Sequence, residues 1–297
     1  MIRGPFIEET QKGTEGNRSP LVPRQTMNSV RHASHEGSFY PKDPDSLSSA
    51  VQALIEDADP KDVSLSPDSI RALILPHGEY RRSGPVAASA YRVLARRSRP
   101  PERVVIAAPL HYYPEYGVVL PTATGYRVPT GLLPVDRKTV QKLAFYAETL
   151  FSEEAHAYEH SIEVHAPFLL GIWGSIPIVP LGFSDISTEV LAHIFDSFLS
   201  DPDTLLLVSS DFSDFLSYDQ SKKIDAESFD KILHGRPVEI LHSCGAIGIN
   251  ALLKAASSHR FEFRLLDARN SGDITGEKKQ VTGYASFAII DRSSPDP

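Results

Sequence analysis

The sequence predicts an α/β fold, with a largely parallel sheet covered by helices on both faces. Two apolar runs, at 70–75 and 104–108, are nearly continuous instead of alternating, as in strands that are buried on both faces. Between them, from about residue 85 to 95, apolar residues recur with a helical period. Strand, helix and strand in this order are typical of a parallel sheet.

The remaining elements follow from the same signals. Asp45 or Ser46 is expected to cap a helix whose apolar face includes Leu47 and Val51, and Pro85 is expected to start the helix after the first strand. Further strands are expected at 117–121, 176–181, 205–208, 261–266 and 281–290, and further helices at 136–150, 159–173, 187–199, 221–233 and 245–256. Residues 126–135 are interpreted as a connection and 270–273 as a loop.

Composition and charge narrow the class of protein. The 297 residues are 41% hydrophobic and 23% charged, as in ordinary globular proteins. A formal net charge of −8 argues against a broad nucleic-acid surface. Because we find neither a signal peptide nor an apolar run of about 18 residues, we expect no membrane association and a cytoplasmic location. The single cysteine, Cys244, excludes an intrachain disulfide.

The two ends of the chain differ from its middle. Residues 1–34 mix glycine, proline, charges and amides without a period, which predicts a disordered tail, and ordered structure is expected from about Gly37. The tail contains LVPR at 21–24, which resembles a protease-cleavage linker, so an engineered extension and a natural tail are both consistent with it. We expect one α/β domain over 35–292 and a frayed C-terminus at 293–297.

Polar side chains follow three of the expected strands. His77, His111 and Asp211 each come shortly after an apolar run, and ligands of open α/β sheets bind beyond the carboxyl ends of the strands. Cys244 precedes an expected helix, whose N-terminal potential favours a thiolate. Two imidazoles with a thiolate or carboxylate would suit Fe, Cu or Zn better than Mg or Ca. Taken singly, Asp211 is equally well interpreted as a cap and Cys244 as a small buried apolar residue.

The chain also resembles a known family from Gly37 to about Ile290. The matching segments are GSFYP at 37, LPHGEYRRSGPVAASAY at 75, APLHYYPEYGVVL at 108, PVDRKTV at 134, EHSIEVHAPFLL at 159, SSDFS at 209, SCGAIG at 243 and NSGDITG at 270. In this order they resemble the Memo family, whose bacterial and archaeal members are called AmmeMemoRadiSam system protein B. That family is similar in fold to class III extradiol dioxygenases, which are non-haem iron enzymes with a three-layer α/β/α sandwich.

The resemblance implies a metal site formed by His77, His111 and Cys244, with Asp211 beside it. Fe(II) is the first expectation for the metal, with Cu or Zn as alternatives. The dioxygenases have a carboxylate as third ligand, whereas Memo-like chains have the cysteine there. A soft thiolate would change which metal binds and its redox behaviour.

This chain departs from the family pattern at several positions. The usual SSDFSH motif has a histidine, expected to be the acid/base, where this chain has Asp214, which is interpreted either as a replacement acid/base or as a solvated side chain. Asp211 is expected to orient a ligand or a bound water, so Asp211 and Asp214 are the candidate catalytic residues. The usual PSH motif has a serine where this chain has Leu110. Glu79 stands where the usual APHAGY motif has a glycine, and we expect it to face solvent instead of adding an oxygen ligand.

His160 and His165 lie five positions apart and do not share a helical face well. Structural roles are therefore expected for both, with His160 near the ligands beside Glu159 and Glu163.

Three hypotheses for function follow. The first is a metal-binding Memo-like protein that acts as a redox enzyme of unknown substrate, with a small-molecule or peptide ligand in its cleft. The alternative is a non-catalytic scaffold or signalling module that uses the cleft to bind a peptide or protein partner, which the Asp214 replacement favours. The third is a thiol-dependent hydrolase that uses Cys244 with a nearby histidine.

Overall fold

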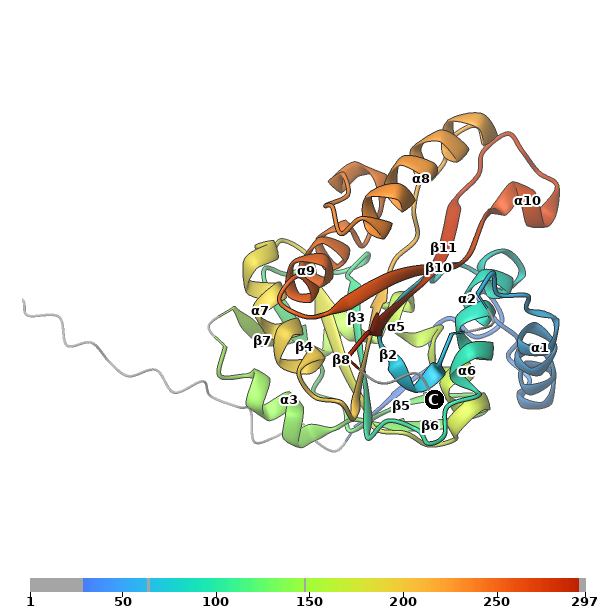
Figure 1. The fold of residues 1–297 in the computed structure, drawn as a ribbon. Coiled ribbons are helices and arrows are strands. Elements are labelled where there is room, and N and C mark those ends of the chain that lie inside the picture. Colours follow the sequence, from blue (N-terminus) through green and yellow to red (C-terminus); the bar gives the residue numbers. More distant parts are fainter. Residues whose placement is uncertain (1–28, 63–64, 147, 294–297) are drawn as a thin grey trace, which may run out of the picture.

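The structure is a computed structural model, and it describes residues 29–62, 65–146 and 148–293 (Figure 1). The strands are β1 (Val30–His32), β2 (Ile70–Leu75), β3 (Arg103–Pro109), β4 (Val118–Leu120), β5 (Gly125–Val128), β6 (Gly131–Pro134), β7 (Thr149–Phe151), β8 (Ile178–Phe183), β9 (Thr204–Ser209), β10 (Phe261–Asn270) and β11 (Gly283–Asp291). The α-helices are α1 (Pro44–Asp57), α2 (Tyr80–Leu94), α3 (Arg137–Leu143), α4 (Glu153–Ala157), α5 (His160–Glu163), α6 (Ala166–Trp173), α7 (Thr188–Leu199), α8 (Tyr218–Leu233), α9 (Ala246–Ala256) and α10 (Ser271–Thr275).

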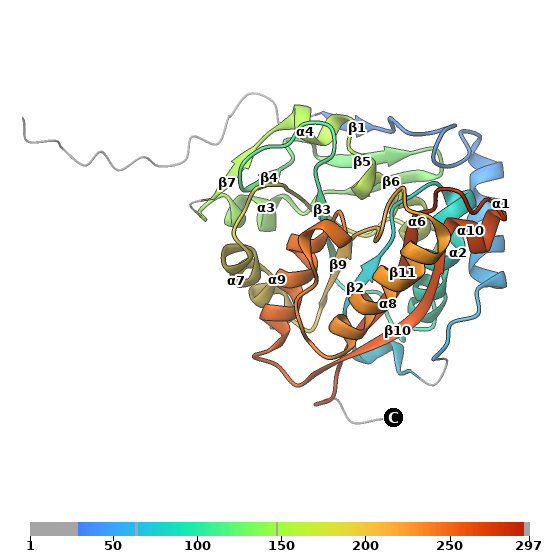
Figure 2. The same ribbon diagram turned by 90° about the horizontal axis from the view of Figure 1, so that it is seen from above.

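The main sheet confirms the predicted fold class. Its eight strands lie in the order β10-β11-β2-β9-β3-β8-β4-β7, and the central four, β2, β9, β3 and β8, are parallel. The outer pairings of β10 with β11, β11 with β2 and β4 with β8 are antiparallel, so the sheet is mixed. Helices α1, α2 and α6 lie on one side of it and α7, α8 and α9 on the other, which makes a three-layer α/β/α sandwich (Figures 1 and 2). Among the described residues, the structure has no helix that is both long and apolar enough to span a membrane.

A second, three-stranded sheet was not predicted. Strand β1 pairs in parallel with β5, and β5 pairs antiparallel with β6, so the supposed connection at 126–135 contains most of a hairpin. Ordered structure is therefore already present at β1, ahead of the expected start at Gly37. The early start depends on distant residues, because Arg31 is buried and its Nη1 lies 2.7 Å from the Glu163 carboxylate of α5. Residues 1–28 of the predicted tail and 294–297 of the predicted frayed end lie outside the described residues.

Helix α2 begins five residues before Pro85, so the predicted start was wrong. Tyr80 explains the difference, because its N–H donates to the Phe39 carbonyl and its hydroxyl to the Val164 carbonyl. These tertiary bonds hold the first turn in helical conformation ahead of the proline. Pro85 then lies within the helix, where its ring leaves one carbonyl without the usual N–H partner.

Other helix boundaries also differ from the predicted ones. The expected helix at 159–173 is two short helices, α5 and α6, and the expected helix at 136–150 ends at Leu143 and is followed by β7. The first helix, α1, is capped by Asp43, two or three residues before the predicted caps, because its carboxylate accepts the Ser46 N–H. Residues 271–275 form α10 where a loop was expected. The strands at the centre of the sheet were placed within two residues.

The register of the central strands places the polar strand ends side by side. Leu75 of β2 pairs with Ser209 of β9, and Ala107 of β3 pairs with Val208, so the three strands finish at nearly the same level. The loops that leave these ends then carry the predicted site residues to one edge of the sheet. This is the edge at which ligands of such sheets are expected.

Candidate metal centre

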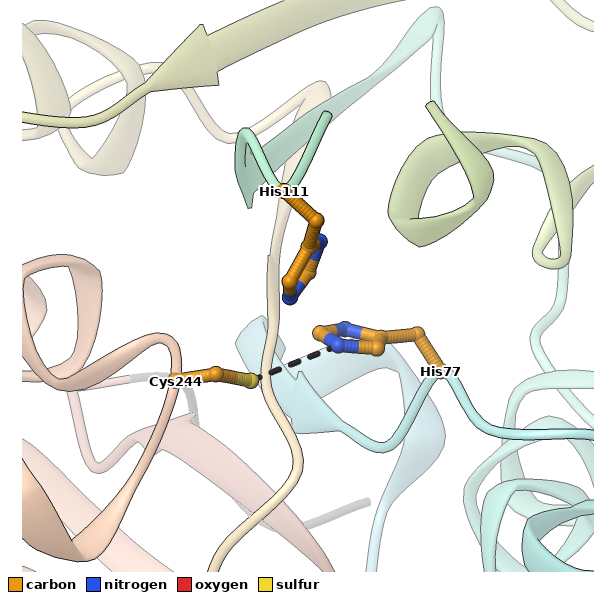
Figure 3. Close-up of side chains that lie close together, drawn as sticks. All are labelled: His77, His111 and Cys244. Carbon is orange, nitrogen blue, oxygen red and sulfur yellow. Dashed lines mark hydrogen bonds between the residues drawn. The ribbon is translucent and has the colours of Figure 1, made fainter. Parts of the chain in front are cut away.

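His77, His111 and Cys244 converge at this edge. One potential ligand atom from each residue lies within 4.8 Å of the other two. Figure 3 shows both imidazoles and the sulfur directed toward a common point, from the loops after β2 and β3 and from the residue pair before α9. The structure therefore brings together the three residues that the resemblance implies as ligands.

His77 is buried, and both of its ring nitrogens have a polar neighbour. Nδ1 lies 2.8 Å from the Ser209 hydroxyl, and Nε2 lies 3.3 Å from the Cys244 sulfur. Because the Ser209 hydroxyl donates to the Ser161 carbonyl, it can only accept from His77. The His77 Nδ1 therefore carries the proton and Nε2 presents a lone pair to Cys244. Burial, and then the neighbouring imidazoles of His111, His160 and His165, lower the pKa of His77 well below its usual value, which keeps the ring neutral.

His111 is held by a buried carboxylate. Its backbone N–H donates to Glu159 Oε2 at 2.6 Å, and its Nδ1 lies 3.0 Å from Glu159 Oε1. Burial would raise the pKa of Glu159, but the hydrogen bonds from His111 and the nearby His111 and His160 rings outweigh burial and lower it to about 2. Glu159 is thus ionised and accepts the Nδ1 proton, and the far nitrogen of His111, Nε2, is free to bind a metal.

Cys244 lies in the cleft just before α9, as predicted, but its pKa moves in the opposite direction from the prediction. Desolvation, followed by the charge of Asp211, raises the pKa of the thiol to about 12, although part of the side chain is exposed to solvent. The helix N-terminus does not offset these effects. The Asp211 N–H lies 3.3 Å from the sulfur. Gly245 allows the close approach to β9, because a Cβ there would lie 2.5 Å from the Ser210 Cβ.

Asp211 and Asp214 take different positions. The Asp211 carboxylate accepts the His77 backbone N–H at 2.8 Å, so it fixes the loop that carries His77. Burial raises the pKa of Asp211 to about 7 against the hydrogen bonds that lower it. Asp214 is exposed, lines the same cleft, and accepts from the Thr282 hydroxyl at 2.5 Å and from the Phe215 N–H at 3.0 Å.

Glu79, His165 and His160 also lie close to the candidate metal centre. Glu79 lines the cleft, and its partly exposed carboxylate forms ion pairs with Arg81 and Arg82. His165 is buried behind the site, where its Nε2 lies 2.9 Å from the Ser209 hydroxyl and its Nδ1 receives the Tyr91 hydroxyl, a structural role as expected. His160 instead lines the cleft, although burial lowers its pKa to about 4.

The cleft above these residues has a volume of about 600 Å³. Its polar lining includes the site residues with Arg82, Thr282 and Tyr284. Its mouth is apolar, because Phe215 and Ile240 are exposed there and Leu241 is 95% exposed. Sequence reasoning missed Ser209 as the support of His77, as well as this apolar mouth. The serine has no motif of its own, and of the three apolar side chains Phe215 lies in a loop and Ile240 and Leu241 in a short 3-10 turn, which is too short to show a period.

Comparisons with known proteins identify relatives of this chain. The family model described as Memo-like protein matches residues 31–288. A MEMO1 family protein of Methanopyrus kandleri is 31% identical over 275 residues, which cover 85% of this chain and 96% of that protein. A MEMO1 family protein of Methanocaldococcus jannaschii is 32% identical over 288 residues, covering 89% and 100%, and the protein memo-1 homolog of Caenorhabditis elegans is 28% identical, covering 88% and 83%.

A solved structure is similar in fold alone. It is the crystal structure of an uncharacterized protein from Escherichia coli K12, with a TM-score of 0.52 and 13% identity, and the match covers 74% of this chain and 99% of that one. The family model spans most of the chain, including all three residues of the candidate metal centre. The chain therefore belongs to the Memo family.

Proposed function

We propose that this Memo protein binds one transition metal ion between His77, His111 and Cys244 and uses it in redox chemistry on a small molecule held in the cleft. Fe(II) is the first expectation, with Cu or Zn as alternatives. The observation that carries the proposal is that three ligand atoms lie within 4.8 Å of one another. A cytoplasmic location stays a prediction.

The residues present fit such an ion. Each imidazole uses its Nδ1 for a hydrogen bond to a protein group, Ser209 for His77 and Glu159 for His111, which orients Nε2 as the ligand atom. Two imidazoles with a thiolate match the softness of Fe, Cu and Zn. When bound, Fe(II) would supply the one-electron and dioxygen chemistry that amino-acid side chains lack.

Asp211 and Asp214 are the proposed proton-handling groups. Asp211 lies against Cys244 and His77, and a pKa of about 7 lets it hold or release a proton near neutral pH. Asp214 faces the outer part of the cleft, where Thr282 donates to it. The two carboxylates would therefore serve different depths of the cleft.

Metal analysis of protein purified without chelator tests the proposal. Substitutions His77→Ala and Cys244→Ala are expected to lower metal content strongly, whereas His193→Ala, at an exposed histidine of α7, is expected to leave it unchanged. Unchanged metal content in both site variants would refute the proposed centre. Circular dichroism of each variant separates loss of metal from loss of fold.

A non-catalytic binding module is the second candidate. The exposed side chains of Phe215, Ile240 and Leu241 favour it, since an apolar mouth of this kind suits a peptide or protein partner. The carboxylate of Asp214, in place of the family's histidine, favours it as well. Turnover of catechol-type substrates by the Fe(II)-loaded protein would contradict it.

The thiol-dependent hydrolase is less well supported. A thiol whose pKa is raised to about 12 is a poor nucleophile at neutral pH, because it is almost entirely protonated. Alkylation of Cys244 that leaves any hydrolytic activity intact would exclude this function.

A further inference from the structure

A second group of potential ligands lies on the other edge of the His111 ring. Glu159 and His160 join His111 in a set whose ligand atoms are also within 4.8 Å of one another. The first set uses the His111 Nε2, which points toward His77 and Cys244 (Figure 3), whereas Nδ1 lies beside the Glu159 carboxylate. The two sets therefore meet at opposite nitrogens of one imidazole.

The distances around Glu159 are those of a metal-binding set. Its Oε1 lies 3.0 Å from His111 Nδ1 and 3.2 Å from His160 Nδ1. A transition metal about 2.0–2.2 Å from each of two donors, at tetrahedral or octahedral angles, holds those donors about 2.9–3.4 Å apart. Little movement would thus be needed to place an ion between these three atoms.

His160 supplies an independent observation. Its Nδ1 is buried and has no hydrogen-bond partner among the residues that the structure describes, even though Glu159 Oε1 is only 3.2 Å away, because the geometry does not allow the bond. Buried polar atoms are seldom left in this state, and an ion that is absent from the structure is one explanation. The ring is held in place by packing, with its centroid 4.6 Å from that of Phe39 and 4.7 Å from that of His111.

Glu159 is also fixed for this purpose. Its Oε1 accepts the Ser161 N–H at 3.0 Å and its Oε2 accepts the His111 N–H at 2.6 Å. The main chain at Glu159 is fixed in turn, because Arg31 donates to its carbonyl at 2.9 Å. A carboxylate held in this way cannot turn away from His111, so the direction of its remaining lone pairs is set in advance.

We propose that His111, Glu159 and His160 form a second metal site, so that the His111 imidazole lies between two ions. The second ion takes the place of the proton that Nδ1 donates to Glu159, and that proton leaves to solvent. Two imidazoles and one carboxylate suit Fe(II), Zn(II) or Co(II). Because the second site has no sulfur ligand, it would differ from the first in affinity and in its absorption spectrum.

The stoichiometry of Zn(II) and Co(II) tests this inference on the full chain. We expect the wild-type protein to bind two equivalents of Zn(II). His160→Ala and His160→Phe should bind one, the latter variant preserving the ring contact with Phe39. Cys244→Ser should also bind one, and His111→Ala none. His35→Phe replaces a neighbouring imidazole outside both ligand sets and should still bind two.

Co(II) distinguishes the two sites by spectrum. The thiolate-to-metal absorption band should persist in both His160 variants and vanish in Cys244→Ser, while that variant still binds one Co(II). A wild-type stoichiometry of one that is unchanged in His160→Ala would overturn the second site and leave the proposed function intact. A stoichiometry of one that is lost in His160→Ala and unchanged in Cys244→Ser would instead support the second site and refute the Cys244 centre.

Discussion

The two histidines of the centre are held in contrasting ways. His77 is buried, and a neutral hydroxyl, Ser209, accepts its Nδ1 proton. His111 is partly exposed, and a buried, ionised carboxylate, Glu159, accepts the corresponding proton. The support of His77 thus comes from the sheet itself, since Ser209 is the last residue of β9. The support of His111 comes from Glu159, the residue that precedes the short helix α5.

The difference shows how one ligand geometry can have two kinds of support. A carboxylate partner raises the basicity of a metal-binding imidazole more than a hydroxyl does, since an ionised acceptor forms the stronger hydrogen bond. The hydroxyl partner, in contrast, demands little beyond correct register of β2 and β9. We therefore expect substitutions on the His111 side to have larger effects than substitutions on the His77 side.

The largest effect is expected at Arg31, which is not a ligand of the proposed centre. Its guanidinium forms a buried ion pair with Glu163 and donates to the carbonyls of His156 and Glu159, so it ties β1 to α4, to α5 and to Glu159, which lies between them. Arg31→Met leaves the buried Glu163 carboxylate without a cationic partner, which costs about 3–5 kcal/mol of unfolding free energy. Chemical denaturation followed by circular dichroism measures this loss.

A surface ion pair provides the control for Arg31. Lys254 and Glu189 lie 2.6 Å apart with both side chains mostly exposed, so solvent screens the pair and Lys254→Ala should cost little or no unfolding free energy. A loss of the same small size for Arg31→Met would show that β1 contributes little to the fold. The His111 side would then be as independent of the N-terminal segment as the His77 side.

The next largest effect is expected on metal affinity when Glu159 is substituted. Glu159→Gln keeps an oxygen acceptor near His111 but removes the charge, and loss of such a partner typically weakens metal binding about 10–100-fold. Titration with Co(II), followed at the thiolate-to-metal band, isolates the centre that contains Cys244. Glu154→Gln, at an exposed position of α4, is the matched control. Equal affinities of the two variants would show that the carboxylate does not support His111.

A change of pH is expected to have a smaller effect on metal affinity. With its pKa raised to about 12, the Cys244 thiol is protonated from pH 6 to pH 9, and a metal that binds the thiolate must displace that proton. The apparent affinity should therefore rise about tenfold for each pH unit over this range. His77 adds nothing to the slope, since its lowered pKa keeps the ring neutral throughout. The slope should disappear in Cys244→Ser, and a flat profile in the wild type would argue against a thiolate ligand.

The sequence predicted the features that depend on local signals and missed those that depend on distant contacts. The apolar runs of β2, β3 and β9 are local signals, and they place His77, His111 and Asp211 at one sheet edge. The pairing of β1 with β5 and the start of α2 depend on distant partners, and no periodicity in the sequence reports them. The raised pKa of Cys244 likewise reflects desolvation and the carboxylate of Asp211, in the loop after β9, which outweigh the local helix N-terminus.

The smallest effect is expected at Ser209, and it tests the contrast most directly. Ser209→Ala removes a neutral acceptor of the His77 Nδ1 proton and leaves the buried Ser161 carbonyl without that donor. A neutral hydrogen bond is worth about 0.5–1.5 kcal/mol, so metal affinity should fall only about 2–12-fold. Ser89→Ala, at a buried serine of α2 that donates to Asp267, should cost similar stability and leave metal affinity unchanged. If Ser209→Ala lowered metal affinity as much as Glu159→Gln does, the charge of the hydrogen-bond partner would not decide how firmly each imidazole is held. The burial of His77 would then be the deciding factor.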